Sequence, residues 1–136
     1  DNYFSQVIIL DVLEHIKDHE KVLQEINRVL KKNSILIISV PNDTILSYLN
    51  PVRYAQHEMH YTIKLITSLL KKRGFKIERI FAGGGIFELM DLYTHLFIKY
   101  TTGKIINLKI FQKLRDNEYR KHNPAGNEII IRVRKV

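Results

Sequence analysis

The chain has 136 residues, 45% of them hydrophobic, which is enough for one domain of ordinary size with its own core. It has no cysteine, no apolar run of about 18 residues and no recognisable signal peptide, so we expect no disulfide, no thiolate metal site, no membrane-spanning helix and no membrane partner, and a cytoplasmic location fits. The formal charge of +8 would suit a nucleic-acid ligand, but the lysines and arginines are dispersed without interleaved aromatic residues, so nucleic-acid binding is not expected.

The first elements form a βαβ unit. Two apolar runs, residues 7–10 and 35–40, flank a segment with apolar residues at helical spacing, which we expect to run from an N-cap at Asp18 through Lys32. Asn33 would then end the helix in a left-handed conformation. Because both runs are continuously apolar, we expect two strands of a parallel sheet that is covered by helices on both faces.

Polar residues follow each of these strands. Asp11, Glu14 and His15 come directly after the first, and Pro41 and Asn42 end the second. Ligands of parallel α/β sheets bind outside the carboxyl ends of the strands. These five residues are therefore predicted to lie on the functional rim.

The middle of the chain is predicted to contain a rim loop, a helix and a strand. Residues 43–61 lack regular periodicity, Thr62 caps a helix that ends at Gly74, and residues 75–81 alternate as a strand. The loop contains three tyrosines, a residue type that commonly packs half-buried at such boundaries. They are Tyr48, Tyr54 and Tyr61, and the loop also contains His57 and His60.

The last third begins with three glycines at 83–85, which we expect to form a flexible turn. Residues 86–126 are predicted to be a helical insertion with helices at 87–100 and 105–121, before residues 128–136 return to the sheet. An apolar face at helical spacing would belong either to the core or to a lid over a substrate. It consists of Phe87, Met90, Phe97, Ile106, Ile110, Phe111 and Leu114.

Three motifs together carry a family resemblance. D-V-L-E-H-I, then E-I-N-R-V-L-K-K, then I-L-I-I-S-V-P-N resemble strand four, its helix and strand five of class I S-adenosylmethionine-dependent methyltransferases. Residues 57–75 resemble the helix leading into strand six, and residues 127–136 the closing antiparallel strand. The resemblance implies a Rossmann-like α/β fold with sheet order four, five, seven, six, in which residues 1–136 form the C-terminal portion of a single domain.

The resemblance also implies S-adenosylmethionine as cofactor and methyl transfer to an oxygen or nitrogen of a small-molecule acceptor. The family's glycine-rich loop and ribose-binding carboxylate precede strand four, and neither is found here. We therefore expect the N-terminal, cofactor-binding half to be missing, and the isolated chain to bind the cofactor weakly and to be inactive. The alternative is a non-catalytic interaction module or regulatory subunit that retains half of the sheet.

The site residues are assigned by the same resemblance. It implies that the loop at residues 43–61 covers the substrate, so the candidates for the pocket wall are Tyr48, Tyr54, His57, His60 and Tyr61. Asp11 and Leu13 would line the methionine end of the cofactor, and His15 or His57 would act as base toward a hydroxyl acceptor. Asp11, Glu14, His15 and His57 also resemble the E-x-x-E-H metal site of small-RNA 2′-O-methyltransferases and ubiquinone-pathway O-methyltransferases. Asp11 replaces a glutamate there, and we expect no metal. In relatives without a metal, Glu14 and His15 would brace the turn.

The first strand also bears on whether copies of the chain associate. In the intact fold a further strand would pair beside residues 7–10, so without it this apolar strand becomes a sheet edge. Such an edge favours a homo-oligomer joined near this strand. The alternative is a monomer in which residues 1–6 shield the edge.

Overall fold

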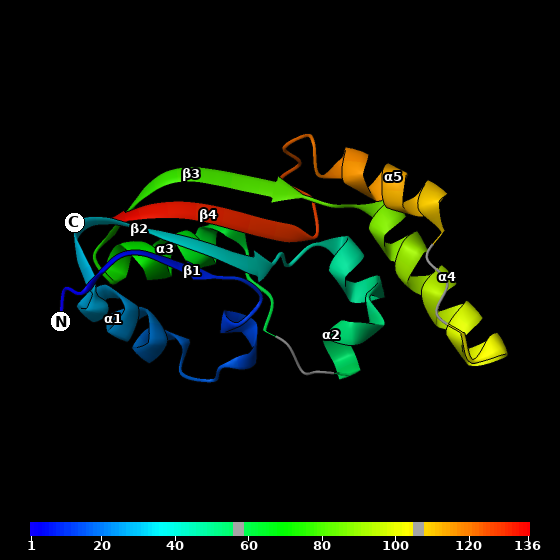
Figure 1. Ribbon diagram of the computed structural model, residues 1–136, viewed down its shortest axis with the longest axis horizontal. Helices are drawn as coiled ribbons and strands as arrows, with labels where there is room; N and C mark the ends of the chain where they lie inside the picture. The colour runs from blue at the N-terminus through cyan, green and yellow to red at the C-terminus, as the bar shows by residue number, and fades with distance from the viewer. Residues whose placement is uncertain (56–58, 105–107) are drawn as a thin grey trace.

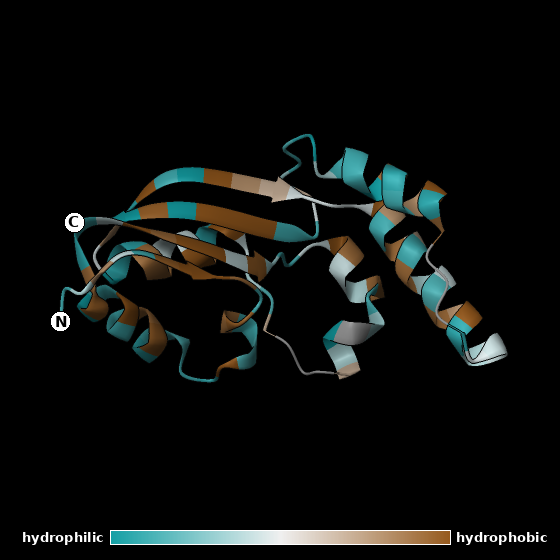
Figure 2. Ribbon diagram, viewed as in Figure 1, coloured by the Kyte–Doolittle hydropathy of each residue, from teal (hydrophilic) through white to brown (hydrophobic). Residues whose placement is uncertain are grey.

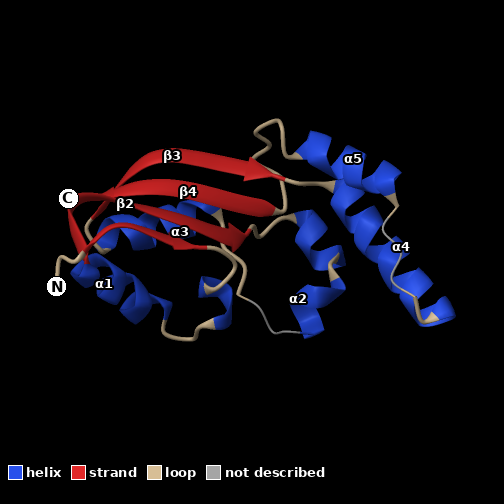
Figure 3. Ribbon diagram, viewed as in Figure 1, coloured by secondary structure: helices blue, strands red, loops and turns tan. Residues whose placement is uncertain are grey.

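A four-stranded mixed sheet organises the computed structural model, which describes residues 1–55, 59–104 and 108–136 (Figures 1 and 3). The strand order is β1-β2-β4-β3, with β1 parallel to β2 and β4 antiparallel to both of its neighbours. The predicted sheet order and the antiparallel last strand are therefore confirmed. The strands are β1 (Phe4–Ile9), β2 (Leu30–Pro41), β3 (Phe75–Gly83) and β4 (Glu128–Lys135).

The helices begin where the sequence supplies caps. The Asp18 carboxylate accepts a hydrogen bond from the amide of Lys21 at 3.1 Å, and the Thr62 hydroxyl accepts one from the amide of Leu65 at the same distance. Gly74, with φ of 80°, follows the third α-helix as predicted. The helices are η1 (Leu13–His15), α1 (His19–Val29), η2 (Ile45–Leu49), α2 (Pro51–Ala55), α3 (Ile63–Lys72), α4 (Ile86–Thr102) and α5 (Lys109–Glu118).

The core lies on one face of the sheet. Helices α1 and α3 lie on the same side of it, and their apolar residues share one buried cluster with alternate residues of the strands, such as Leu36, Ile38 and Val40 (Figure 1). The opposite face is not covered in the described part of the chain, and Ile8 on it is 55% exposed. The prediction that both strands are covered on two sides is therefore wrong for this chain, because no described helix packs on that face.

The boundary between α1 and β2 differs from the prediction. Helix α1 ends at Val29, three residues before Lys32, because Leu30 is fully buried and pairs with Phe4 of β1. Asn33 does have a positive φ of 63°. It lies within β2, where the pairing with β1 is irregular, and does not end the helix.

The segment after β2 is more regular than predicted, because η2 and α2 occupy part of the expected loop. The predicted helical insertion is present as α4 and α5, which contact each other and project beyond the end of the sheet (Figure 1). Its predicted apolar face is not core: Met90 is 42%, Phe97 70% and Ile110 66% exposed, whereas Leu89 is buried. Ile106 lies outside the described residues. Within the described part of the chain, no helix is long and apolar enough to cross a membrane.

Candidate functional site

A cavity of about 250 Å³ opens where β1 and β2 end. Because β4 is antiparallel to β2, its first residue lies at this same edge, with Glu128 paired opposite Pro41. Elements η1, η2 and α4 supply the remaining walls. The lining residues are Asp11, Glu14, His15, Pro41, Ser47, Asn50, His60, Glu88, Asn127 and Glu128.

Asp11 and Glu128 form the floor of the cavity on the side of the sheet. Asp11 leaves β1 with φ of 52°, its amide donates to Ser39 Oγ at 3.1 Å, and the Ser39 hydroxyl donates to Asp11 Oδ1 at 2.7 Å. Burial, together with the neighbouring Asp11 carboxylate, raises the pKa of Glu128 to about 8. The fold therefore favours the protonated form of the Glu128 carboxyl group.

Glu14 and His15 enter the cavity from η1. The Glu14 side chain is only 4% exposed, while the His15 side chain is 42% exposed, and His15 Nε2 lies 3.8 Å from Glu14 Oε1. The Glu14 carbonyl also accepts a hydrogen bond from the amide of Met59 at 3.1 Å, which ties η1 to the segment carrying His60. On that segment, His60 Nδ1 lies 3.4 Å from the carbonyl oxygen of Asn42.

Glu88 of α4 is held in place by two donors. Tyr119 Oη donates to Glu88 Oε1 at 3.0 Å, and Asn127 Nδ2 donates to Glu88 Oε2 at 2.8 Å. Burial, followed by the charge of Glu88, raises the pKa of the Tyr119 phenol, so this hydroxyl remains a donor. The Glu88 carboxylate is therefore held in one orientation at the cavity wall.

The three glycines before α4 serve this packing. All three are buried, and Gly84 has φ of 82°. A Cβ atom at Gly84 would lie 2.5 Å from Glu88 Oε2. The predicted flexible turn is wrong: Gly83 is the last residue of β3, and Gly84 and Gly85 link it directly to α4 in close contact with the Glu88 and Glu118 carboxylates.

The Glu118 carboxylate of α5 binds the N-terminal turn of α4. Glu118 Oε1 and Oε2 accept hydrogen bonds from the amides of Phe87 and Glu88, at 3.1 Å and 3.2 Å. These amides belong to the first turn of α4, whose N-terminal dipole favours a negative charge. Helix α5 therefore fixes the start of α4, and with it the position of Glu88.

Asp11, Glu14 and His15, predicted from the sequence, do come together in the cavity. Leu13 points elsewhere: its side chain is fully buried in the core and does not line the cavity. Its role at the cofactor stays a prediction. His57, the other predicted base and metal ligand, lies outside the described residues. Among the residues that the structure describes, no group of three or more acidic or histidine side chains is arranged to hold a metal ion.

The tyrosines predicted for the pocket wall are distributed differently. Tyr61 is fully buried in the core, with its hydroxyl 3.4 Å from the Leu13 carbonyl oxygen that accepts its hydrogen bond. Tyr48 and Tyr54 are more than half exposed, and neither lines the cavity. Of the loop candidates in the described part, His60 is the one found in the lining.

Glu88, Asn127 and Glu128 were missed by sequence reasoning. A signal existed for Glu128, because the closing strand was expected to be antiparallel and its first residues must then lie at the edge where the parallel strands end. An acidic residue at that position, before an apolar strand, could have been included in the site. For Glu88 there was no such signal, since its place depends on how α4 packs.

The lining provides four carboxyl groups and two imidazoles. Asp11, Glu14, Glu88 and Glu128 surround the space with acceptors, and His15 and His60 add groups that can exchange protons near neutral pH. Such a lining favours a positively charged or proton-donating ligand. It also offers several acceptors for a proton released from a bound ligand.

Comparisons with known proteins point to one family. Residues 1–80 match the family model described as "Methyltransferase domain". A probable S-adenosylmethionine-dependent methyltransferase of Mycolicibacterium smegmatis is 31% identical over 91 residues, which cover 61% of this chain and 34% of that protein. The chain thus spans about a third of the curated relative's length.

Two solved structures share the fold. A putative sarcosine dimethylglycine methyltransferase from Galdieria sulphuraria superposes with a TM-score of 0.61 at 20% identity, covering 99% of this chain and 54% of that chain. Phosphoethanolamine N-methyltransferase 2 from Haemonchus contortus, a complex with S-adenosyl-L-methionine, gives 0.62 at 21% identity, covering 98% of this chain and 34% of that chain.

Proposed function

Since the chain belongs to the S-adenosylmethionine-dependent methyltransferase family, we propose that it forms the acceptor-binding part of such an enzyme and takes part in methyl transfer to an oxygen or nitrogen of a small molecule. The observation that carries this proposal is the cavity at the carboxyl ends of β1 and β2. Ligands of α/β sheets bind at this edge. Helix α4 supplies one wall of the cavity through Glu88.

The donor set fits the cofactor. S-adenosylmethionine, when bound, supplies the methyl group from a positively charged sulfonium centre. Asp11 would face that charge, and two observations support this role: it follows β1 directly, and the Ser39 hydroxyl donates to its carboxylate at 2.7 Å. Leu13 would act through the backbone of η1, since its side chain is buried.

Acceptor deprotonation would use the groups around the cavity. His15 is half exposed at the mouth and remains our proposed base, together with His57. Glu128, whose pKa is raised to about 8 by burial and by the Asp11 carboxylate, would be a second proton acceptor when it is ionised. Glu88, which Tyr119 and Asn127 orient, would position the acceptor rather than exchange protons.

The test is methyl transfer from labelled S-adenosylmethionine to a panel of small amines, alcohols and phenols, with the protein expressed from its complete coding sequence. We expect Glu88→Gln to lower kcat/KM for an accepted substrate by about tenfold or more, because a charged wall group is lost. The matched control is Glu25→Gln, an exposed glutamate on α1 far from the cavity. If Glu88→Gln and Glu25→Gln behave alike with every accepted substrate, the cavity is not the acceptor site.

Cofactor binding is measured separately by isothermal titration. The 136-residue chain is expected to bind S-adenosylmethionine weakly, because it contains neither a glycine-rich loop after a first strand nor a ribose-binding carboxylate after a second. Tight stoichiometric binding by this chain would show that the cofactor site does not need those elements.

A further inference from the structure

Helix α4 has a continuous apolar stripe on its exposed side. Its members are spaced alternately four and three residues apart, so they share one face of the helix over roughly 21 Å. The last two, Phe97 and Tyr100, are 70% and 81% exposed. The stripe consists of Ile86, Met90, Tyr93, Phe97 and Tyr100.

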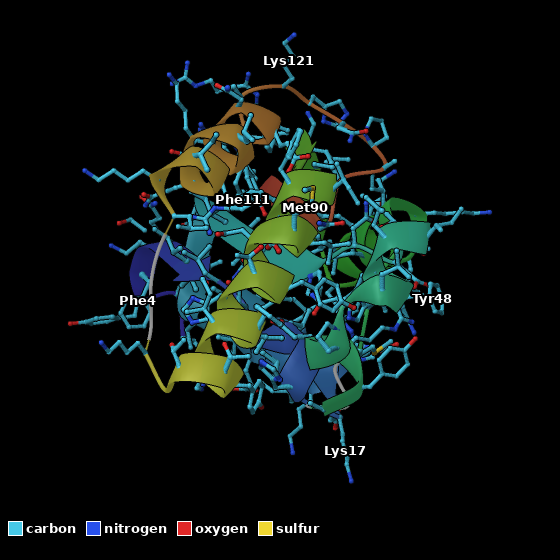
Figure 4. All side chains as sticks on the ribbon, turned by 90° about the vertical axis from the view of Figure 1, so that its right-hand side faces the viewer. Phe4, Lys17, Tyr48, Met90, Phe111 and Lys121 are labelled. Carbon is cyan, nitrogen blue, oxygen red and sulfur yellow. The ribbon has the colours of Figure 1, made fainter. Side chains whose placement is uncertain are left out.

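The stripe is not needed to pack the hairpin of α4 and α5. A different face of α4 makes those contacts: Asp91 pairs with Arg115 of α5 at 3.0 Å, and Glu88 accepts a hydrogen bond from Tyr119 at the end of α5. Figure 4 looks at this end of the molecule, with α4 crossing the middle and Met90 on the side toward the viewer. In Figure 2 the apolar bands of α4 lie on a helix that stands clear of the sheet. The stripe is therefore exposed at the surface of the described molecule, and Tyr93, whose hydroxyl donates to the Leu49 carbonyl of η2, is still about half exposed.

The hairpin around the stripe is basic. Residues 86–121 contain seven lysines and arginines against four acidic residues. Three of the acids face inward: Glu88 accepts from Tyr119, Asp91 pairs with Arg115, and Glu118 accepts from the first amides of α4. The outward charge is therefore strongly positive. The exposed basic residues are Lys99, Lys104, Lys109, Lys113, Arg120 and Lys121.

We propose that the outer face of α4, together with the basic residues of the α4–α5 hairpin, docks on an anionic membrane surface. An apolar stripe with tyrosine and phenylalanine, on a helix flanked by lysines, is the pattern of a helix that lies in the membrane interface. Such docking needs no membrane-spanning helix. A second copy of the chain fits less well, because its own hairpin would bring the same positive charge.

This docking surface is independent of the proposed methyl transfer, since the stripe and the cavity use different faces of α4. Glu88 faces the cavity, whereas Met90 and Phe97 belong to the stripe. A membrane at this end would also lie next to the site. The enzyme would then meet acceptors that are dissolved in, or held at, the lipid surface.

The experiment is co-sedimentation of the 136-residue chain with vesicles of phosphatidylcholine alone and with vesicles of phosphatidylcholine mixed with phosphatidylglycerol. We expect binding to the mixed vesicles, weakened by added salt because the attraction is partly electrostatic. Tyr100→Glu should lower the partition coefficient by about tenfold, since it removes an inserted ring and adds a negative charge. Tyr3→Glu is the matched control: Tyr3 is 75% exposed, against 81% for Tyr100, and belongs to the N-terminal segment, which lies at the end of the molecule opposite α4 (Figure 1).

Four results would overturn the proposal. They are no binding to the mixed vesicles, equal binding to both vesicle types, an equal effect of Tyr100→Glu and Tyr3→Glu, and a dimer in light scattering without lipid that Tyr100→Glu dissociates. The last would show that the stripe is a contact between two copies. Circular dichroism of both variants, matching the wild type, establishes that neither change has unfolded the chain.

Discussion

Replacing Glu128 with glutamine should change how the stability of this protein depends on pH. In the folded protein, burial and the nearby Asp11 carboxylate raise the pKa of Glu128 from 4.5 to about 8. Folding therefore favours the protonated form, so the stabilisation is fully present below pH 4.5 and is lost as the pH rises to about 8. At about 1.4 kcal/mol per pKa unit, the loss amounts to at most about 5 kcal/mol of unfolding free energy.

The glutamine variant keeps a neutral side chain at every pH, and its amide can donate to Asp11 as the protonated carboxyl does. We expect it to resemble the wild type near pH 5 and to be more stable by several kcal/mol near pH 9, by about the amount given above. The measurement is urea unfolding, followed by circular dichroism, at intervals across this range. Glu25→Gln, on the exposed side of α1, serves as the control for removing a carboxylate elsewhere.

The comparison of wild type with variant isolates Glu128, because the histidines and the other carboxyl groups titrate in both proteins. A difference in unfolding free energy that stays constant across the pH range would refute the reasoning. It would mean that the pKa of Glu128 is not raised in the folded protein.

Three further predictions concern the fold. Gly103→Ala should lower the unfolding free energy, measured in urea, by about 1 kcal/mol, and Gly84→Ala should lower it by well over that amount. Both positions have positive φ, but only Gly84 lacks room for a methyl group. Equal costs would contradict the close packing. If β1 joins copies of the chain, Ile8→Lys should lower the molar mass in light scattering, since Ile8 lies on the sheet face that no described helix covers. Ile9→Lys should mainly destabilise the fold, because Ile9 packs against the core. A mass unaffected by Ile8→Lys would argue against a β1 contact. Asp18→Ala should cost about 1 kcal/mol in unfolding free energy through loss of the α1 cap, and no measurable change would mean that another group replaces it.

The parts of the fold that were predictable depend on local sequence. The apolar runs of β1 and β2, the helical spacing of α1 and α3 and the caps at Asp18 and Thr62 each specify their own element with little help from distant residues. The sheet order came from the resemblance of these motifs to a known family, and Asp11, Glu14 and His15 could be placed at the site because they directly follow a strand.

Tertiary structure alone decided the rest. Helix α4 and strand β4, which are distant in sequence from β1 and β2, contribute Glu88 and Glu128 to the cavity. Glu88 is oriented by Tyr119 and Asn127, which are more than thirty residues away in the sequence. Periodicity marks which residues of a helix are apolar, but it does not say whether a partner covers them. Phe97 was therefore expected in a core or beneath a lid and is found on the surface. Burial and pairing are properties of the assembled fold. For that reason, the raised pKa of Glu128 and the exposed apolar stripe of α4 could not be found in the sequence.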